Sequence, residues 1–209
     1  VTAVVGAGGK TTLIHTLAEQ YRAAGLRVLV TTTTHMYREP GMLLDPDAEA
    51  LVQTLRARGF AAAGSAAAGG KFGALPSAVY AAGCAAADEV LVEADGARGK
   101  LVKLPAPHEP VLPDNAQRIL LVCNLKAIGQ PLAEAAHRAE LVSDCLQIPQ
   151  DALLTGNHLQ ILACRYLALL RAARPDCEVR LQVNHDGSPA QARLAAAMEQ
   201  QHSRKKKRT

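Results

Sequence analysis

The sequence predicts an α/β fold, a three-layer sandwich in which a mostly parallel β-sheet lies between layers of helices. Short runs rich in β-branched residues alternate along the chain with segments whose apolar residues follow helical spacing. The first two runs, residues 2–5 and 27–32, are separated by about twenty mostly helical residues, as in the right-handed crossover between parallel strands. The chain has 209 residues, of which 49% are hydrophobic. That length suits one domain with a sizeable core, which we place at residues 1–202.

The element boundaries rest on glycine, proline and capping signals. Gly25 and Gly59 are placed to end helices, and Asp45-Pro46 resembles an N-cap followed by proline at the first helical position. Asn157 is a second candidate N-cap. We therefore expect strands over residues 2–5, 27–32, 60–63, 90–93, 119–123 and 179–183. We expect helices over residues 11–24, 46–58, 77–87, 132–145 in pieces, 157–173 and 189–201.

Two segments are expected to lack regular structure. Residues 62–73 are rich in alanine and glycine and are typical of a loop. Residues 96–113 contain four prolines, which remove backbone donors and interrupt helices and strands.

Composition argues against several classes of protein. The formal charge is +4, but residues 204–208 contribute +5, which leaves 18 basic against 19 acidic residues elsewhere. A nearly neutral body with 3% aromatic residues offers no basic stripe or stacking surface for nucleic acid. We interpret residues 203–209 as a basic, disordered tail. Five scattered cysteines without a C-x-x-C pair, no signal peptide and no membrane-length apolar stretch predict a cytoplasmic protein with reduced thiols.

The first strand ends in the loop Gly6-Ala7-Gly8-Gly9-Lys10-Thr11-Thr12, and a helix begins there. Glycines can turn the backbone through positive φ and bring amide N–H groups close to phosphate oxygens. The start of the helix favours an anion, Lys10 can reach the β- and γ-phosphates of a nucleotide, and Thr11 can hold Mg²⁺. We therefore predict a P-loop nucleoside triphosphate hydrolase-like fold that binds ATP or GTP with Mg²⁺ at residues 6–12.

The loop departs from the usual G-x-x-x-x-G-K-[ST] spacing, because Val4 stands where the first glycine belongs. The shorter G-x-G-G-K-T-T form resembles the ATP loop of the Mur-type peptide ligases. A plain glycine turn between strand and helix would explain the glycines, but it would not explain Lys-Thr-Thr at the helix start.

Two carboxylates follow a buried strand, in Val90-Leu91-Val92-Glu93-Ala94-Asp95-Gly96. Phosphoryl chemistry needs a carboxylate at such a strand end, to hold Mg²⁺ or to position water. We predict Lys10, Glu93 and Asp95 as catalytic residues and Thr11 and Asp95 as metal ligands. The alternative is an ordinary Asp-Gly turn preceded by a strand-end charge.

Other polar residues give weaker signals. Thr31 to Thr34 and His35 close the second strand, at the end where open α/β sheets place ligands. Lys71, Arg98, Lys100 and Lys103 lie in loops and could contact a phosphate or be ordinary surface cations. Asn184-His185-Asp186 is similar to the Asn-Lys-x-Asp base reader of guanine-nucleotide proteins. It lacks the lysine and is one residue short, so it does not decide the base.

The glycine loop, Thr31 to His35, the Glu93-Ala94-Asp95-Gly96-Ala97 segment and Lys103-x-Pro105-x-x-His108-Glu109-Pro110-Val111 together resemble the selenium-dependent hydroxylase accessory proteins (YqeC type). The likeness extends from residue 1 to about residue 186. It implies an accessory role in maturing molybdenum hydroxylases that carry selenium, through a nucleotide-dependent step. It also implies that Lys103, His108 and Glu109 join the glycine loop as ligand-binding residues, and that a molybdenum hydroxylase or its cofactor-maturation proteins are partners.

Two functions from different classes remain open. The chain could be an Mg²⁺-dependent NTPase or phosphoryl transferase. It could instead hold a nucleotide or a molybdenum cofactor for delivery without turnover. An ATP-dependent ligase ranks last, because the chain is too short for the two further domains of those enzymes.

Overall fold

The computed structural model describes residues 1–203, and these group into two compact units. The first unit comprises residues 1–4, 10–96 and 110–117. The second comprises residues 5–9, 97–109 and 118 to the end of the described chain. Strand β1 (Thr2–Gly6) begins in the first unit and ends in the second. The single domain expected over residues 1–202 stays a prediction, and the predicted disordered tail begins at Ser203, beyond which the chain lies outside the described residues.

The first unit contains a mostly parallel sheet in the order β1-β7-β2-β5-β6-β3, with β4 beside β5. Its strands after β1 are β2 (Val28–Thr32), β3 (Met36–Tyr37), β4 (Leu43–Leu44), β5 (Phe60–Ala67), β6 (Lys71–Gly73) and β7 (Glu89–Glu93). Its helices are α1 (Lys10–Ala23), α2 (Ala48–Arg58) and α3 (Ser77–Ala86). The pairs formed by β1 with β7, β7 with β2 and β2 with β5 are parallel, and only the short β5-β6-β3 extension is antiparallel.

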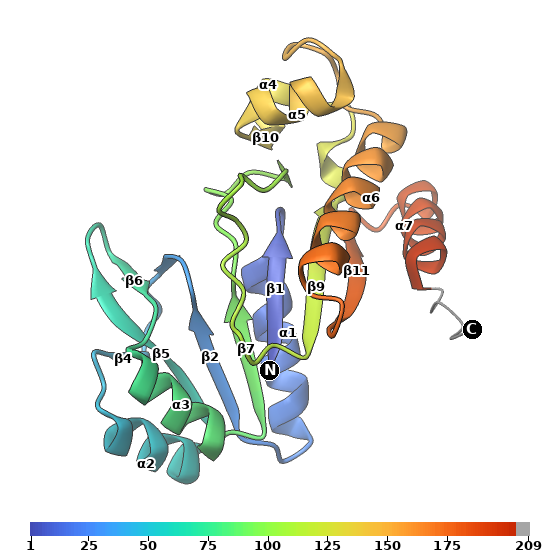
Figure 1. Ribbon diagram of the computed structural model, residues 1–209. Coiled ribbons are helices and arrows are strands. Elements are labelled where there is room, and N and C mark those ends of the chain that lie inside the picture. The colour runs from blue at the N-terminus through green and yellow to red at the C-terminus, as the bar shows by residue number, and fades with distance from the viewer. Residues whose placement is uncertain (204–209) are drawn as a thin grey trace. The chain divides into compact units, whose positions relative to one another are not determined.

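Helices lie on both faces of this sheet. Figure 1 shows α2 and α3 side by side in front of β2 and β5, with α1 behind β1 and β7. Alternation along the strands explains the arrangement, since Leu29, Val90 and Val92 pack with Leu51 and Leu55 of α2. Glu93 has the opposite parity from Val92, so its side chain faces the α1 side.

The second unit is built on β9 (Arg118–Asn124) and β11 (Glu178–Asn184), which pair in parallel over their full lengths. Helix α6 (Gly156–Ala173) packs on both strands, and α7 (Pro189–Ser203) packs on β11. A second, two-stranded sheet joins β8 (Val102–Lys103) to β10 (Ala136–His137). The remaining elements are η1 (Leu125–Ala127), α4 (Leu132–Ala135) and α5 (Ala139–Leu146). The predicted α/β class with a mostly parallel sheet and flanking helices is confirmed.

Four local predictions were wrong. The segment 62–73 is not a loop but the β5–β6 hairpin, where a side chain at Gly64 would come within 2.3 Å of the Phe72 ring. Asp47, not Asp45, caps α2 by accepting from the Ala50 amide at 2.7 Å, while Asp45 accepts from Ala66. Thr155 caps α6, two residues before the predicted Asn157, because His158 completes a reciprocal capping box with it. The segment 96–113 also contains the short strand β8.

Candidate functional site

The glycine loop adopts a backbone that other residues would strain. Gly6, Gly8 and Gly9 have φ of +93°, +77° and +120°. A Cβ at Gly6 would lie 2.2 Å from the Val122 carbonyl oxygen, and one at Gly9 would lie 2.4 Å from Asn184 Nδ2. Both conformation and space therefore require glycine in this loop.

Two asparagine side chains both donate hydrogen bonds to one carbonyl oxygen of the glycine loop. Asn124 Nδ2 donates to the Gly8 oxygen at 2.7 Å, and Asn184 Nδ2 donates to the same oxygen at 3.0 Å. In a trans peptide the C=O and the following N–H point in opposite directions. Anchoring the Gly8 carbonyl therefore directs the Gly9 N–H away from the two asparagines.

The amides of the loop are not equivalent. The Ala7 N–H donates to the Val122 oxygen at 3.1 Å, so this amide is engaged by β9. Thr11 and Thr12 lie in the first turn of α1, where a helix supplies no acceptors for its own N–H groups. Thr12 is exposed, and its carbonyl accepts from Thr16 Oγ1 at 3.0 Å.

In the first unit, a carboxylate faces the start of α1. Glu93 Oε1 lies 3.9 Å from Lys10 Nζ, and Glu93 Oε2 accepts from Thr11 Oγ1 at 3.2 Å. Lys10 and Glu93 are both buried. The structure thus brings together Lys10 and Thr11, at the beginning of α1, and Glu93, at the end of β7, three residues that the sequence singled out.

The backbone around Glu93 is fixed by its neighbours in the sheet. Glu93 pairs with Val4 of β1 on one side and with Thr32 of β2 on the other. Its carbonyl oxygen accepts from Thr32 Oγ1 at 2.7 Å and from the Thr33 amide at 3.1 Å. Thr32 therefore acts on the Glu93 backbone, while Thr31 Oγ1 is buried without a hydrogen-bond partner in the described part of the chain.

Asp95 lies completely buried just beyond β7. The sheet continues past the strand, because the Ala94 amide donates to the Val4 oxygen at 3.0 Å. The Ala94 oxygen in turn accepts from the Val111 amide at 3.2 Å. This ladder fixes the backbone on the N-terminal side of Asp95. His35, by contrast, is exposed.

A second charged group lies in the second unit and contains Lys103 and Glu109. Lys103 Nζ lies 2.8 Å from Glu109 Oε2, and the Lys103 side chain is fully buried. Arg138 donates to both Glu109 oxygens, at 2.6 and 3.0 Å, and the Ala106 amide donates at 3.2 Å. His108 is exposed, and within residues 1–203 no hydrogen bond or ion pair joins its side chain to this group.

The charges around Glu109 determine its ionisation. Burial raises the pKa of this carboxyl, but the hydrogen bonds from Arg138, Lys103 and the Ala106 amide outweigh burial and lower the pKa to about 2. Glu109 is therefore ionised throughout the physiological range, and it serves as the acceptor at the centre of the group.

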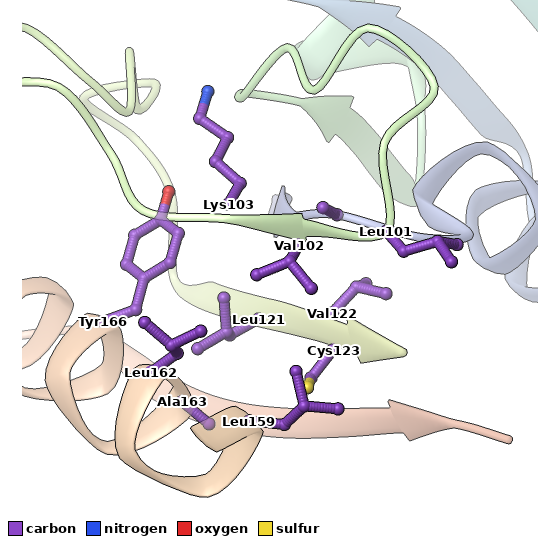
Figure 2. Close-up of a pocket in the computed structure, with 11 residues that line it drawn as sticks. Leu101, Val102, Lys103, Leu121, Val122, Cys123, Leu159, Leu162, Ala163 and Tyr166 are labelled. Carbon is purple, nitrogen blue, oxygen red and sulfur yellow. The ribbon is translucent and has the colours of Figure 1, made fainter. Parts of the chain in front are cut away.

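A small apolar cavity of about 20 Å³ separates Ala7 from α6 in this unit. Figure 2 shows the apolar side chains that line it, with the Lys103 ammonium extending away from them. Cys123 also lines the cavity, and burial raises the pKa of its thiol to about 12. The volume is that of a single water molecule, so we assign no ligand to the cavity.

Sequence reasoning missed Asn124 and Arg138. Asn124 follows the predicted strand 119–123, so its place at a strand end was an available signal. No local sequence pattern marks Arg138 as a site residue, because it reaches Glu109 only through a tertiary contact. Asn184 was considered as part of a base reader, whereas in the structure its amide supports Gly8.

Comparison with known proteins agrees with these motifs. The sequence model of the YqeC protein family matches residues 2–140, which is more than half of the chain. The chain belongs to the YqeC family. The "Uncharacterized protein YqeC" of Escherichia coli (strain K12) is 35% identical over 183 residues, which is 78% of this chain. The match spans 66% of that relative's length, slightly less than two thirds. No solved structure matches the chain.

The YqeC match covers the glycine loop, Glu93 and Asp95, and the Lys103–Glu109–Arg138 group. Asn184 lies outside it.

Within residues 1–203, no helix combines the length and the apolar character that crossing a lipid bilayer requires. Over the same residues, no three His, Cys, Asp or Glu side chains gather as a metal centre would need.

Removing the loop anchor should loosen the glycine loop. We expect Asn124→Ala to lower the free energy of unfolding by about 1–2 kcal/mol, because the half-buried Gly8 carbonyl loses one of its two amide donors. Asn124→Asp should cost more, since a carboxylate would face that carbonyl. Urea unfolding measures both, with the exposed Asn157→Ala as control, and amide hydrogen exchange at Gly9 should accelerate in the Asn124 variants only. Equal stability of the Asn124 and Asn157 variants would contradict the anchor.

The Glu109 group should give the protein a specific acid sensitivity. The pKa of Glu109 falls from 4.5 to about 2 on folding. The contribution of its ionised carboxylate to the free energy of unfolding is therefore complete above pH 4.5 and is lost as pH falls towards 2. Glu109→Gln should therefore unfold more easily by about 3 kcal/mol at pH 7, because Arg138 and the buried Lys103 both lose an ionised partner. That difference should shrink between pH 4.5 and 2, as urea unfolding at a series of pH values would show. A difference independent of pH would refute the charge assignment.

Proposed function

We propose that this YqeC protein binds a nucleoside triphosphate at residues 6–12, as a P-loop protein, and hydrolyses it with Mg²⁺. The observation that supports the proposal most strongly is the start of α1. There Lys10 and Thr11, directly after the left-handed glycines, both contact the carboxylate of Glu93. A plain turn between strand and helix has no need for this arrangement.

The loop residues supply the anion-binding part. The Gly9 N–H, directed away from the asparagines by the anchored Gly8 carbonyl, and the N–H groups at the start of α1 offer donors to phosphate oxygens. Lys10 adds the single positive charge of the loop. In the free protein this charge lies beside Glu93, so the ammonium has an acceptor before phosphate arrives.

Hydroxyl and carboxylate oxygens suit Mg²⁺, which prefers oxygen ligands and keeps several waters. Thr11 Oγ1 and Asp95 are the proposed metal ligands, and Mg²⁺ would neutralise charge on the phosphates. Glu93 is the proposed residue that positions or deprotonates the attacking water, because its carboxylate already accepts a hydrogen bond at the helix start.

We also propose that this nucleotide-dependent step serves the maturation of a selenium-dependent molybdenum hydroxylase in the cytoplasm. The support is the resemblance that the sequence motifs carry and the family membership of the chain. The alternative to an enzyme is a carrier that holds a nucleotide or a molybdenum cofactor without turnover.

Variants at Lys10 and Glu93 test nucleotide binding and turnover separately. We expect Lys10→Ala to weaken binding of ATP or GTP by about 10–100-fold, because a charge-assisted contact to phosphate is lost. Glu93→Gln should keep binding but slow hydrolysis by on the order of 100-fold. Fluorescent-nucleotide titration and phosphate release with Mg²⁺ measure the two effects, and the exposed Arg56→Ala in α2 controls for loss of a positive charge.

Three results would count against the proposal. Absence of ATP and GTP binding at millimolar concentration would refute the proposal that residues 6–12 bind nucleotide phosphates. Binding without phosphate release above that of Lys10→Ala would favour the carrier. For the accessory role, failure of the tagged protein to co-purify with a molybdenum hydroxylase from cells that make one would contradict the partner.

A further inference from the structure

A hollow opens in the first unit between the last turns of α1 and α2, and we call it the α1–α2 hollow. Its volume is about 400 Å³, and its lining comes from the two helix ends and the turns that follow them. Small-molecule sites in proteins occupy roughly 300–1,000 Å³. Arg22, in the lining, follows Lys10 by twelve residues along α1, a rise of about 18 Å. The hollow is therefore separate from the start of α1, where the phosphate site is proposed.

Two glycine turns fix the walls of the α1–α2 hollow. After α1, Gly25 has φ of +80°, and its amide donates to the Arg22 oxygen at 2.9 Å. After α2, Gly59 has φ of +66°, and its amide donates to the Leu55 oxygen at 3.0 Å. The Gly59 oxygen accepts from the Val28 amide at 3.0 Å, so the end of α2 is tied to the start of β2. The backbone around the hollow is thus held by hydrogen bonds of the protein itself.

Two guanidinium groups line the α1–α2 hollow, Arg22 from α1 and Arg58 from α2. The Arg22 guanidinium lies over the Phe60 ring, 5.0 Å from its centroid. Such stacking engages the face of the guanidinium and leaves the N–H groups in its plane able to donate. Within residues 1–203, neither side chain forms an ion pair or a hydrogen bond. The hollow therefore offers two guanidinium groups to a ligand, and one of them is already oriented.

The charges of the lining favour an anion. Among the described residues that line the hollow, Glu19 is the only acidic one, and it forms an ion pair with neither arginine. Arg27 directly follows the lining residue Leu26, but its guanidinium donates to both oxygens of Asp88, at 3.0 and 2.9 Å, so this pair adds no net charge. Ala23 and Leu26 add apolar surface to the lining.

We propose that the α1–α2 hollow binds the carboxylate or phosphate group of a small organic anion between Arg22 and Arg58. A guanidinium group suits either oxyanion, because its parallel N–H groups match two of the ligand's oxygens. The carbon atoms of the ligand would lie against Ala23 and Leu26. This site goes beyond the proposed nucleotide function and does not depend on it.

NMR titrations of the full chain with inorganic phosphate and, separately, with hexanoate test the hollow. We expect at least one of the two probes to shift the amide signals of residues 22, 25, 58 and 59, and the probe that binds more tightly identifies the preferred head group. Absence of shifts at these residues with both probes at tens of millimolar would refute the site.

Two variants at the end of α2 distinguish the hollow from the general charge of the helix end. Arg58→Gln should weaken binding of the tighter probe about tenfold, because one charge-assisted contact is lost. Arg56→Gln removes a second exposed arginine from the same helix turn, outside the lining, and should change binding less than about twofold. Equal weakening by both variants would contradict the assignment to the hollow.

Glu19→Gln gives a test of opposite sign. Removing the negative charge from the lining should strengthen binding of the tighter probe about two- to fivefold. An affinity that is unchanged or weaker in this variant would count against the site.

Lys10→Ala distinguishes the hollow from the glycine loop. This variant should show the wild-type amide shifts at residues 22, 25, 58 and 59, even if nucleotide binding is lost. If binding of the tighter probe disappears in Lys10→Ala and survives in Arg58→Gln, the probe occupies the glycine loop and the proposed site is wrong.

Discussion

The candidate site depends on the peptide between Gly8 and Gly9, whose orientation is fixed by two asparagine amides. A peptide plane can expose either its carbonyl or its N–H to a ligand, and the two choices have opposite effects on an anion. Asn124 and Asn184, at the ends of β9 and β11, donate hydrogen bonds to the Gly8 carbonyl oxygen. The glycines are then a structural requirement, because the loop has positive φ and passes close to both asparagines.

Glu93 places a negative charge beside Lys10 at the start of α1. A buried ammonium without a counter-charge would be costly, and a carboxylate on the adjoining strand reduces that cost. The contact between Lys10 and Glu93 is long, at 3.9 Å, whereas Thr11 makes a hydrogen bond to the same carboxylate at 3.2 Å.

The group around Glu109 is held more firmly. A fully buried lysine and a bidentate arginine share one carboxylate, so removing that carboxylate would take a counter-charge from both cations. This group fixes the segment 103–109 to the start of α5, although that segment contains few backbone hydrogen bonds of its own. The prolines that prevent regular structure there make such side-chain contacts necessary.

The α/β class could be predicted from the sequence, as could the glycine loop at the start of α1 and the strand that ends in Glu93. These follow from periodicity and from residue types whose backbone preferences act locally. The other features follow from contacts between residues far apart in the chain. The hairpin over residues 60–73 forms because small side chains allow Phe72 to pack closely on Gly64, which composition cannot show. Asn124, Asn184 and Arg138 reach their partners across 116, 176 and 29 residues, and such pairings are set by the way strands and helices pack and not by any local pattern.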